Sequence, residues 1–281
     1  MTNIKILIVT HKEFPLPQND IFLPIQVGKK IAAHKMNIQG DDEGDNISEK
    51  NPNYGELTAL FWAWKNLKTD IIGLYHYRRY FRFKTNFLFS KRIYYSPENQ
   101  IYGYKINSKK IEDLLAKYDV LMTKPRIYPY SLEIGYRASH VWEDLLIIEE
   151  IIKKKHPEYA LTWDRVIKFN NKLPHFNMFI CNYDIFEKYC IWLFDILFEA
   201  EKQIKLSPYK YQQRVFGFLG ERLQLLYFTH NKYTIKYLPI YFFKSEGENR
   251  TDHSSLSYYF QDKLLNVSFI TGTAKNFFRK K

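Results

Sequence analysis

Residues 70–80 join a short apolar run to a dense group of basic and aromatic side chains. The apolar run 71–74 is typical of a buried strand, and it leads directly into His76, Arg78 and Arg79. In open α/β sheets, ligands bind just outside the carboxyl ends of strands, where these side chains would lie. Arginine guanidinium groups are planar donors that suit a diphosphate or a carboxylate. The alternative is a basic surface loop whose arginines pair with acidic neighbours.

Short apolar strands alternate with helical segments along the chain, which predicts an α/β fold with a mostly parallel sheet. No Gly-x-Gly-x-x-Gly motif follows a strand and no Walker loop is present, so the chain is neither a standard dinucleotide fold nor a P-loop protein. Segments 14–52 and 82–107 are predicted to be irregular. The predicted strands are 5–9, 71–74, 119–123, 176–181 and 234–243, and the predicted helices are 57–67, 108–117, 141–155, 184–201 and 208–230.

Polar residues at the start of three predicted helices favour capping. Asn53 with Glu56, and Asp184 with Glu187, have the spacing of a capping box, in which side chains bond to free backbone N–H groups. Ser108 is predicted to cap the helix that follows it. A plain capping role is therefore the favoured interpretation of Glu56.

The chain is strongly basic, which implies an anionic partner. Lysine and arginine total 42 and aspartate and glutamate total 30, giving a net charge of +12. Such an excess fits nucleic acid, an anionic membrane face or a phosphorylated small molecule. The basic residues are scattered, and no zinc-finger spacing, KH loop or RNP motif is present. We therefore predict a phosphorylated ligand and no nucleic acid.

The cysteines and the start of the chain indicate a cytoplasmic protein. Cys181 and Cys190 lie in apolar surroundings without a CxxC motif, as expected of free thiols in a reducing compartment. Residues 1–10 lack a signal-peptide cleavage pattern, and no apolar stretch is long enough to span a bilayer. Basic and aromatic side chains leave open a peripheral contact with the cytoplasmic face of the inner membrane.

Five short motifs follow one another along the chain. They are Gly-Asp-Asn-Ile-Ser at 44–48, the helical stretch 56–66, Gly-Leu-Tyr-His-Tyr-Arg-Arg-Tyr at 73–80, Asn-Met-Phe-Ile at 177–180, and 214–222. In this order they resemble a family of bacterial capsule and O-antigen biosynthesis glycosyltransferases known as domain of unknown function 4422. Each motif is weak alone, but the combination is specific and covers roughly residues 4–245. The resemblance implies a GT-A-like glycosyltransferase domain at 1–245, followed by a partly ordered C-terminal tail at 246–281.

The layout is also similar to that of glycogenin-like enzymes, with one important departure. Those enzymes place Asp-x-Asp after the central strand to hold a divalent metal on the diphosphate, whereas this chain has His76-Tyr77-Arg78. Two carboxylates bind a hard cation, but a histidine and an arginine do not. The leaving UDP still needs its negative charge stabilised. We therefore expect His76, Arg78 and Arg79 to supply that charge, with neither a metal nor a cofactor.

The resemblance implies roles for further residues. An inverting transferase needs a carboxylate that takes the proton of the acceptor hydroxyl. Asp144, and after it Glu143, match the Glu-Asp pair of inverting GT-A enzymes, although both also favour a helix N-terminus. The candidate donor-binding residues also have structural interpretations: they could form ordinary turns, be buried for structural reasons or make surface ion pairs. The predicted donor-binding residues are Thr10, His11, Lys12, Asp45, Asn46, Tyr75, Tyr77, Arg79, Asn177, Arg214 and Glu221.

The resemblance finally implies the reaction. The expected enzyme moves a galactose-type hexose from a UDP-sugar to an oligosaccharide or lipid-linked glycan in surface polysaccharide synthesis. UDP-galactofuranose with inversion is the first expectation, and retaining pyranosyl transfer of the glycogenin-like kind is the second. Two alternatives are not enzymes: a basic protein that binds nucleic acid, and a peripheral membrane scaffold with an inactive transferase fold.

Overall fold

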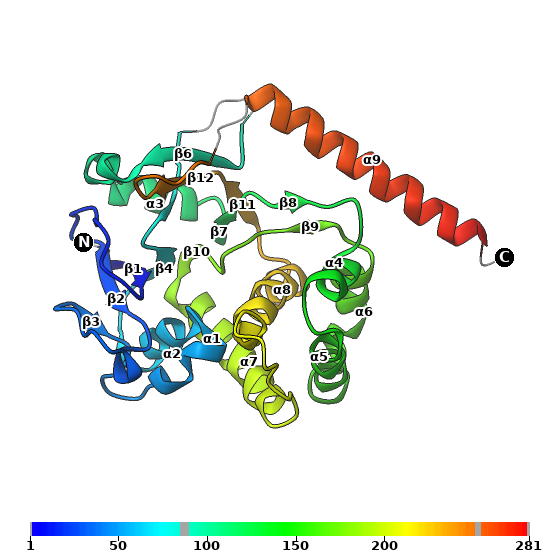
Figure 1. The fold of residues 1–281 in the computed structure, drawn as a ribbon, viewed down its shortest axis with the longest axis horizontal. Coiled ribbons are helices and arrows are strands. Elements are labelled where there is room, and N and C mark those ends of the chain that lie inside the picture. The colour runs from blue at the N-terminus through cyan, green and yellow to red at the C-terminus, as the bar shows by residue number, and fades with distance from the viewer. Residues whose placement is uncertain (1, 85–89, 251–253, 280–281) are drawn as a thin grey trace.

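The structure is a computed structural model that describes residues 2–84, 90–250 and 254–279. Its centre is a twisted sheet whose strands pair in parallel except for one, which runs antiparallel to both of its neighbours (Figure 1). The mixed α/β fold and the mostly parallel sheet expected from the sequence are therefore confirmed. In spatial order the strands are β11 (Ile235–Leu238), β7 (Val120–Thr123), the antiparallel β10 (Phe179–Asn182), β4 (Ile71–His76), β1 (Ile4–Thr10), β2 (Phe22–Gln26) and β3 (Gln39–Gly40).

A second group of strands continues from β4 and brings distant segments together. β5 (Arg79–Phe81) turns back sharply, so that Arg79 pairs directly with His76 of β4. β12 (Ile240–Lys244) then pairs antiparallel with β5 and parallel with β6 (Ile93–Pro97). A separate two-stranded sheet is formed by β8 (Arg126–Ile127) and β9 (Lys172–Leu173).

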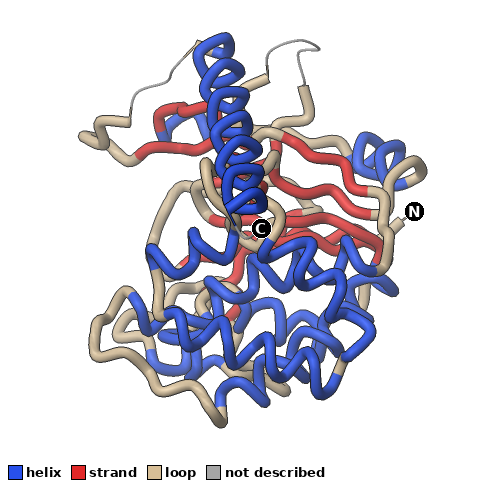
Figure 2. Tube along the Cα trace, turned by 90° about the vertical axis from the view of Figure 1, so that its right-hand side faces the viewer, coloured by secondary structure: helices blue, strands red, loops and turns tan. Residues whose placement is uncertain are grey.

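Most helices gather on one side of the sheet, as Figure 2 shows. A π-helical turn at Asp164–Lys168 follows α6, and 3-10 turns occupy 29–31, 48–50, 98–103, 157–159 and 212–214. The α-helices are α1 (Asn51–Tyr54), α2 (Leu57–Asn66), α3 (Ser108–Leu115), α4 (Leu132–Ser139), α5 (Trp142–Lys155), α6 (Ala160–Trp163), α7 (Tyr183–Glu201), α8 (Val215–His230) and α9 (Ser255–Arg279).

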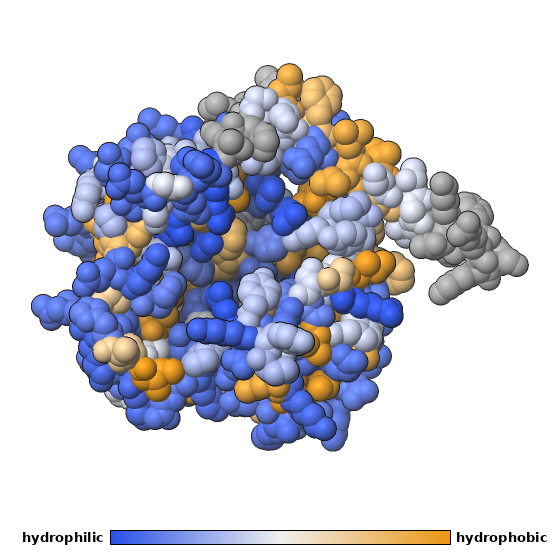
Figure 3. All heavy atoms as spheres, in the orientation of Figure 1, coloured by the Kyte–Doolittle hydropathy of each residue, from blue (hydrophilic) through white to orange (hydrophobic). Residues whose placement is uncertain are grey.

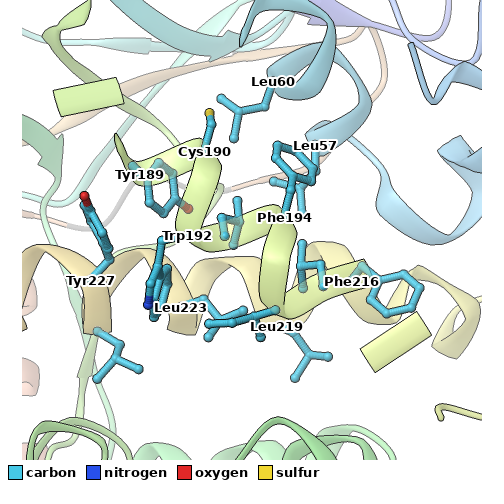
Figure 4. Packing of buried hydrophobic residues seen from close by; sticks show 14 of the residues in the cluster. Leu57, Leu60, Tyr189, Cys190, Trp192, Phe194, Phe216, Leu219, Leu223 and Tyr227 are labelled. Carbon is cyan, nitrogen blue, oxygen red and sulfur yellow. The ribbon is translucent and has the colours of Figure 1, made fainter. Parts of the chain in front are cut away.

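The strands of the sheet separate two apolar cores. Successive side chains of a strand point to opposite faces, so Leu7 and Val9 of β1 pack with the main helices, whereas Ile6 and Ile8 pack on the other side. The helical core is continuous from α2 through α7 to α8, and Figure 4 shows Leu60, Phe194 and Leu219 among its side chains. This packing fixes the sheet edge from which the site residues project.

The segments predicted to be irregular contain three strands that the sequence did not reveal. β2, β3 and β6 lie in 14–52 and 82–107, and each is short and only partly buried. Pro24 interrupts the apolar pattern of β2, which pairs with β1 on one side and the two-residue β3 on the other. The nearby Asp41 is fully buried and accepts hydrogen bonds from the backbone N–H groups of Gly28 (2.9 Å) and Lys29 (3.2 Å). Asp41 therefore stabilises the loop that contains Gly28 and Lys29.

The predicted helix caps are wrong. Neither α2, which follows Glu56, nor α7, which follows Asn182, has a side-chain cap. Asn53 lies in α1, and its amide donates to the Gln213 carbonyl oxygen (3.0 Å). The cap of α3 is Asn107, whose side chain accepts from the Lys109 N–H (2.8 Å), rather than Ser108. The polar residues at the start of α2 are thereby available for other contacts.

The tail after residue 245 contains the longest helix of the chain, α9, which lies at the edge of the molecule against β8. Among the residues that the structure describes, no helix combines the length and the apolar character needed to cross a membrane.

Candidate functional site

A cleft of about 930 Å³ opens at the carboxyl ends of β1, β2 and β4. His11 and Val27 follow β1 and β2, and His76 and Tyr77 end β4. The opposite wall comes from α1, α4, α8 and the short strand β8. Figure 3 shows the hollow near the centre of the face. The cleft therefore lies where an open α/β sheet places its ligand.

The cleft is rich in cationic and aromatic side chains and poor in carboxylates. Its two acidic lining residues are Glu56 and Glu221. Such a composition favours an anionic ligand that also carries a sugar or a base. The basic lining residues are Arg79, Arg126, Lys210, Arg214 and Arg222, and the aromatic ones are Tyr77, Tyr128, Tyr130, Phe176, Tyr211 and Phe218.

Arg79 is the most unusual cation of the cleft. Its guanidinium carbon lies 4.3 Å from the ring centre of Phe176 and 5.1 Å from that of Phe242. Burial lowers the pKa of Arg79 to about 10, and its Nε is buried without a hydrogen-bond partner among the described residues. A buried, charged group without a bonded counterion is unfavourable unless a ligand completes it. Arg79 thus lines the cleft with unused donors.

Arg78 points elsewhere, although it precedes Arg79. Its guanidinium pairs with the Glu248 carboxylate, and its Nε donates to the Phe243 carbonyl oxygen (3.1 Å). The separation follows from the hairpin, because the direct β4–β5 pair is His76 with Arg79, and paired residues project to one face of a sheet. The structure therefore brings one of the two predicted arginines to the cleft.

His76 lines the cleft beside Arg79, in surroundings that disfavour its positively charged form. Burial lowers the pKa of the imidazole, although the charge of Glu56 opposes the shift. A hydrogen bond joins its Nε2 to the Phe176 carbonyl oxygen (2.7 Å). The cationic role predicted for His76 does not fit these surroundings, and its position favours packing and polar contact with the ligand.

Asn177 stabilises residues of the cleft without lining it. Phe176 and Asn177 both have left-handed backbone φ angles, of 80° and 52°, and such a bend exposes the carbonyl oxygen that His76 contacts. The Asn177 amide donates to Glu56 Oε1 (2.7 Å) and to the Gly217 carbonyl oxygen (3.1 Å). Asn177 is 1% exposed and does not line the cleft, so it positions Glu56 rather than the donor directly.

Glu56 and Glu221 have different hydrogen-bond surroundings. Glu56 uses Oε1 to accept from Asn177, and its Oε2 lies 3.6 Å from the Arg214 guanidinium, beyond hydrogen-bond distance. Both oxygens of Glu221 are engaged, by His175 Nδ1 (3.2 Å) and by the Phe176 N–H (2.6 Å). Glu56 therefore keeps one carboxylate oxygen free to accept a proton.

The pKa of Glu221 makes it a weak base. Burial alone would raise this pKa, but the charge and hydrogen bond of His175 and the charge of Arg222 lower it to about 2. A carboxylate with such a low pKa accepts a proton poorly at neutral pH. Glu221 lies in the cleft as predicted, and its bonds to His175 and Phe176 fix the loop that shapes the floor.

The remaining donor-binding candidates divide between the cleft and its surroundings. His11, Tyr77 and Arg214 line the cleft, and the rings of His11 and Tyr77 meet edge to face at 5.5 Å. Thr10 is buried and donates its hydroxyl hydrogen to the Lys12 carbonyl oxygen, and neither residue lines the cleft.

Three further candidates lie outside the cleft. Tyr75 is fully buried in the second core, among aromatic rings that include Tyr80 at 5.6 Å. Asp45 and Asn46 belong to a loop held by its own hydrogen bonds and by Asn66, whose amide donates to the Asp45 carbonyl oxygen (2.8 Å). These positions support a structural role for all three residues.

Asp144 and Glu143 also lie outside the lining of the cleft. Both are in the first turn of α5, and Asp144 is 5% exposed. Burial, and then the charge of Glu143, raise the pKa of Asp144 to about 6. The structure therefore does not bring the predicted proton acceptor to the cleft.

Replacing Asp144 by Asn is expected to raise the melting temperature by a few degrees near pH 8 and to leave it unchanged near pH 4. The folded chain holds this carboxyl at a pKa of about 6 instead of the ordinary 3.8. Stability therefore falls as the pH rises through the folded pKa, and asparagine removes this dependence. Thermal melts across that pH range measure the effect. An equal shift at both pH values would point to a change in packing instead.

Several cleft residues were not predicted. Arg126, His140 and His175 come from loops or short elements, and only folding places them opposite β4. Two arginines of the cleft could have been proposed from the sequence, because Arg126 follows a predicted strand and Arg222 ends one of the family motifs. Arg222 lies over the Tyr136 ring (4.7 Å) and donates to the Phe218 carbonyl oxygen (2.9 Å).

The residues present do not fit a divalent metal. Carboxylate oxygens are the preferred ligands of Mg²⁺ and related cations, and the position after β4 carries an imidazole and guanidinium groups instead. Within residues 2–84, 90–250 and 254–279, no group of three or more histidine, cysteine, aspartate or glutamate side chains is placed to hold a metal. Arginines are the alternative source of positive charge.

Comparisons with known proteins agree with this geometry. The model of a family described as a domain of unknown function (DUF4422) matches residues 5–232. Among solved structures, the apo structure of the WbbM bifunctional glycosyltransferase is similar, with 30% sequence identity and a TM-score of 0.79 over 90% of this chain. The chain spans about half the length of that protein, since 47% of it is covered. A comparison with curated proteins finds no match.

Proposed function

The chain belongs to the DUF4422 family, and from this membership we propose that it is a glycosyltransferase that moves a hexose from a UDP-sugar to a glycan acceptor. The observation that carries the proposal is Arg79, a partly buried guanidinium in a cationic cleft at the carboxyl ends of the parallel strands, whose Nε has no hydrogen-bond partner among the described residues. A diphosphate supplies the acceptor oxygens that such a group lacks. The likeness to a bifunctional glycosyltransferase supports the same reaction class.

The cleft offers a group for each part of the transfer. The acceptor hydroxyl attacks the anomeric carbon as the bond from that carbon to the β-phosphate oxygen breaks, and the bonding electron pair leaves with UDP. Arg79, Arg214 and Arg126 stabilise the developing negative charge. The hydroxyl proton passes to Glu56, whose Oε2 is the unbonded carboxylate oxygen of the cleft. We propose this assignment in place of Asp144.

The finer features of the reaction rest on the family resemblance. We propose a galactose-type donor, with galactofuranose first, and inversion at the anomeric carbon. We also propose a role in the synthesis of a surface polysaccharide, at the cytoplasmic side of the inner membrane. Cys181 and Cys190 are both buried free thiols, which suits a reducing compartment.

UDP-galactose is expected to raise the melting temperature of the chain in a buffer that contains EDTA. A ligand that binds the native state stabilises it by an amount that grows with the logarithm of the ratio of ligand concentration to dissociation constant. The arginines should hold the diphosphate without a metal. Thermal-shift measurements with UDP-, GDP-, CMP- and dTDP-sugars check both points, with UDP-sugars expected to give the largest shift.

Two results would contradict the proposal. Stabilisation that depends strictly on Mn²⁺ or Mg²⁺ would refute charge neutralisation by arginine alone. Absence of a shift with all the nucleotide sugars, together with RNA binding that weakens steeply as salt rises, would favour the nucleic-acid alternative.

A further inference from the structure

Helix α9 has an apolar face that the described part of the chain leaves uncovered. Its residues recur every three or four positions, as they do on one side of an α-helix, and each is more than a third exposed. Figure 3 shows apolar side chains over the upper right of the molecule, where Figure 1 places α9. The exposed apolar residues are Leu256 (49%), Tyr259 (37%), Phe260 (56%), Leu264 (68%), Val267 (55%) and Ile270 (57%).

The opposite face of α9 is the one that holds the helix to the body. Tyr258 is 9% exposed, and the guanidinium of Arg92 lies 5.9 Å from its ring centre. Farther along the helix, the Asn171 amide donates to the Asn266 side-chain oxygen (3.4 Å). Because this face already anchors α9, folding does not account for the exposed apolar side.

The charges of the α9 segment are mostly basic. The sequence 255–281 contains five basic residues and one acidic residue, Asp262. Asp262 interacts with Arg92, Lys124 and Lys172 of the body, so its negative charge is turned inward. Lys263 lies among the exposed apolar residues, with its ammonium group 5.0 Å from the Tyr259 ring centre. A lysine with its stem on an apolar face can extend its charge to lipid headgroups.

We propose that the exposed face of α9 binds the surface of an anionic membrane, lying in its plane without crossing it. An apolar stripe with aromatic residues, the neighbouring Lys263 and no outward acidic side chain is suited to the interface between acyl chains and anionic headgroups. α9 packs on β8, and Arg126 of β8 lines the cleft. A docked helix therefore keeps the cleft beside the bilayer, within reach of a lipid-linked acceptor if the proposed function holds.

The test is co-sedimentation of the full chain with vesicles. The wild-type chain should bind vesicles that contain phosphatidylglycerol, bind phosphatidylcholine vesicles more weakly, and lose affinity as salt rises. The double variant Phe260→Asp/Leu264→Asp should lose roughly tenfold or more in affinity, because two apolar side chains no longer enter the interface. Ser257→Asp/Ser268→Asp is the matched control, since it adds the same charge at exposed positions of the same helix and removes no apolar side chain.

Three outcomes would overturn the proposal. The first is that the wild-type chain does not bind vesicles. The second is that both double variants lose the same amount of vesicle affinity. The third is that the wild-type chain is a dimer that does not bind vesicles and becomes monomeric in the Phe260→Asp/Leu264→Asp variant. The last result would show that a second copy covers the stripe. Circular dichroism and thermal melts establish that each variant is folded. Vesicle binding needs no nucleotide sugar, so it can succeed or fail independently of the transferase assignment.

Discussion

Replacing Arg79 by Met is expected to weaken UDP binding by a factor on the order of 100. The substitution keeps a long side chain against Phe176 and Phe242 but removes the buried charge. Charge-assisted hydrogen bonds in such surroundings contribute roughly 2–3 kcal/mol, and each 1.4 kcal/mol is about a tenfold change in affinity. Isothermal titration with UDP measures the effect. Arg79→Lys should recover part of the affinity, because lysine restores the charge without the planar pair of donors.

Arg78→Met is the matched control for this experiment. Arg78 has the same side chain one residue earlier, but it pairs with Glu248 and contacts the Phe243 carbonyl oxygen outside the cleft. Its loss should lower the melting temperature and leave the dissociation constant for UDP nearly unchanged. Equal weakening in both variants would mean that the two arginines act through the stability of the hairpin rather than through contact with the diphosphate.

Glu56→Gln is expected to lower the rate of sugar transfer by a factor of about 10² to 10⁴ and to leave UDP affinity within a few fold. Glutamine keeps an oxygen that can accept from the Asn177 amide, as Glu56 Oε1 does at 2.7 Å. It cannot take a proton from the acceptor hydroxyl. The release of UDP in the presence of a glycan acceptor measures the transfer rate, and titration with UDP measures binding.

Asp144→Asn distinguishes the two candidate proton acceptors. Asp144 lies in the first turn of α5, outside the lining of the cleft, so this variant should transfer sugar at a rate close to that of the wild-type chain. If Glu56→Gln kept the wild-type rate of sugar transfer and Asp144→Asn had no activity, the assignment would be reversed and Asp144 would be the proton acceptor. Loss of transfer in both would indicate that the carboxylates act together or that α5 moves when substrate binds.

The elements with strong apolar patterns were predictable from the sequence. The strands β1, β4 and β7 and the helix α5 fall close to their expected positions, because an uninterrupted buried run has few alternative structures. β2, β3 and β6 escaped prediction because they are short and have no uninterrupted buried apolar run. Such strands depend on tertiary pairing more than on their own residues.

The candidate site was predictable where its residues follow a central strand directly. His76, Tyr77 and Arg79 could be placed at the end of β4, but the hairpin that turns Arg78 away depends on the pairing of His76 with Arg79. Glu56 was expected to cap a helix, and only the bond from Asn177, far along the chain, turns it into a cleft residue. Long-range contacts of this kind leave no periodic signal in a single sequence.

The aromatic rings around Arg79 determine whether its side-chain entropy is lost on folding or on ligand binding. A free arginine side chain carries about 2 kcal/mol of rotamer entropy, which a binding reaction normally has to overcome. Phe176 and Phe242 already immobilise this guanidinium in the ligand-free chain. The rotamer entropy of Arg79 is therefore lost during folding, and the binding of a diphosphate does not have to overcome that loss.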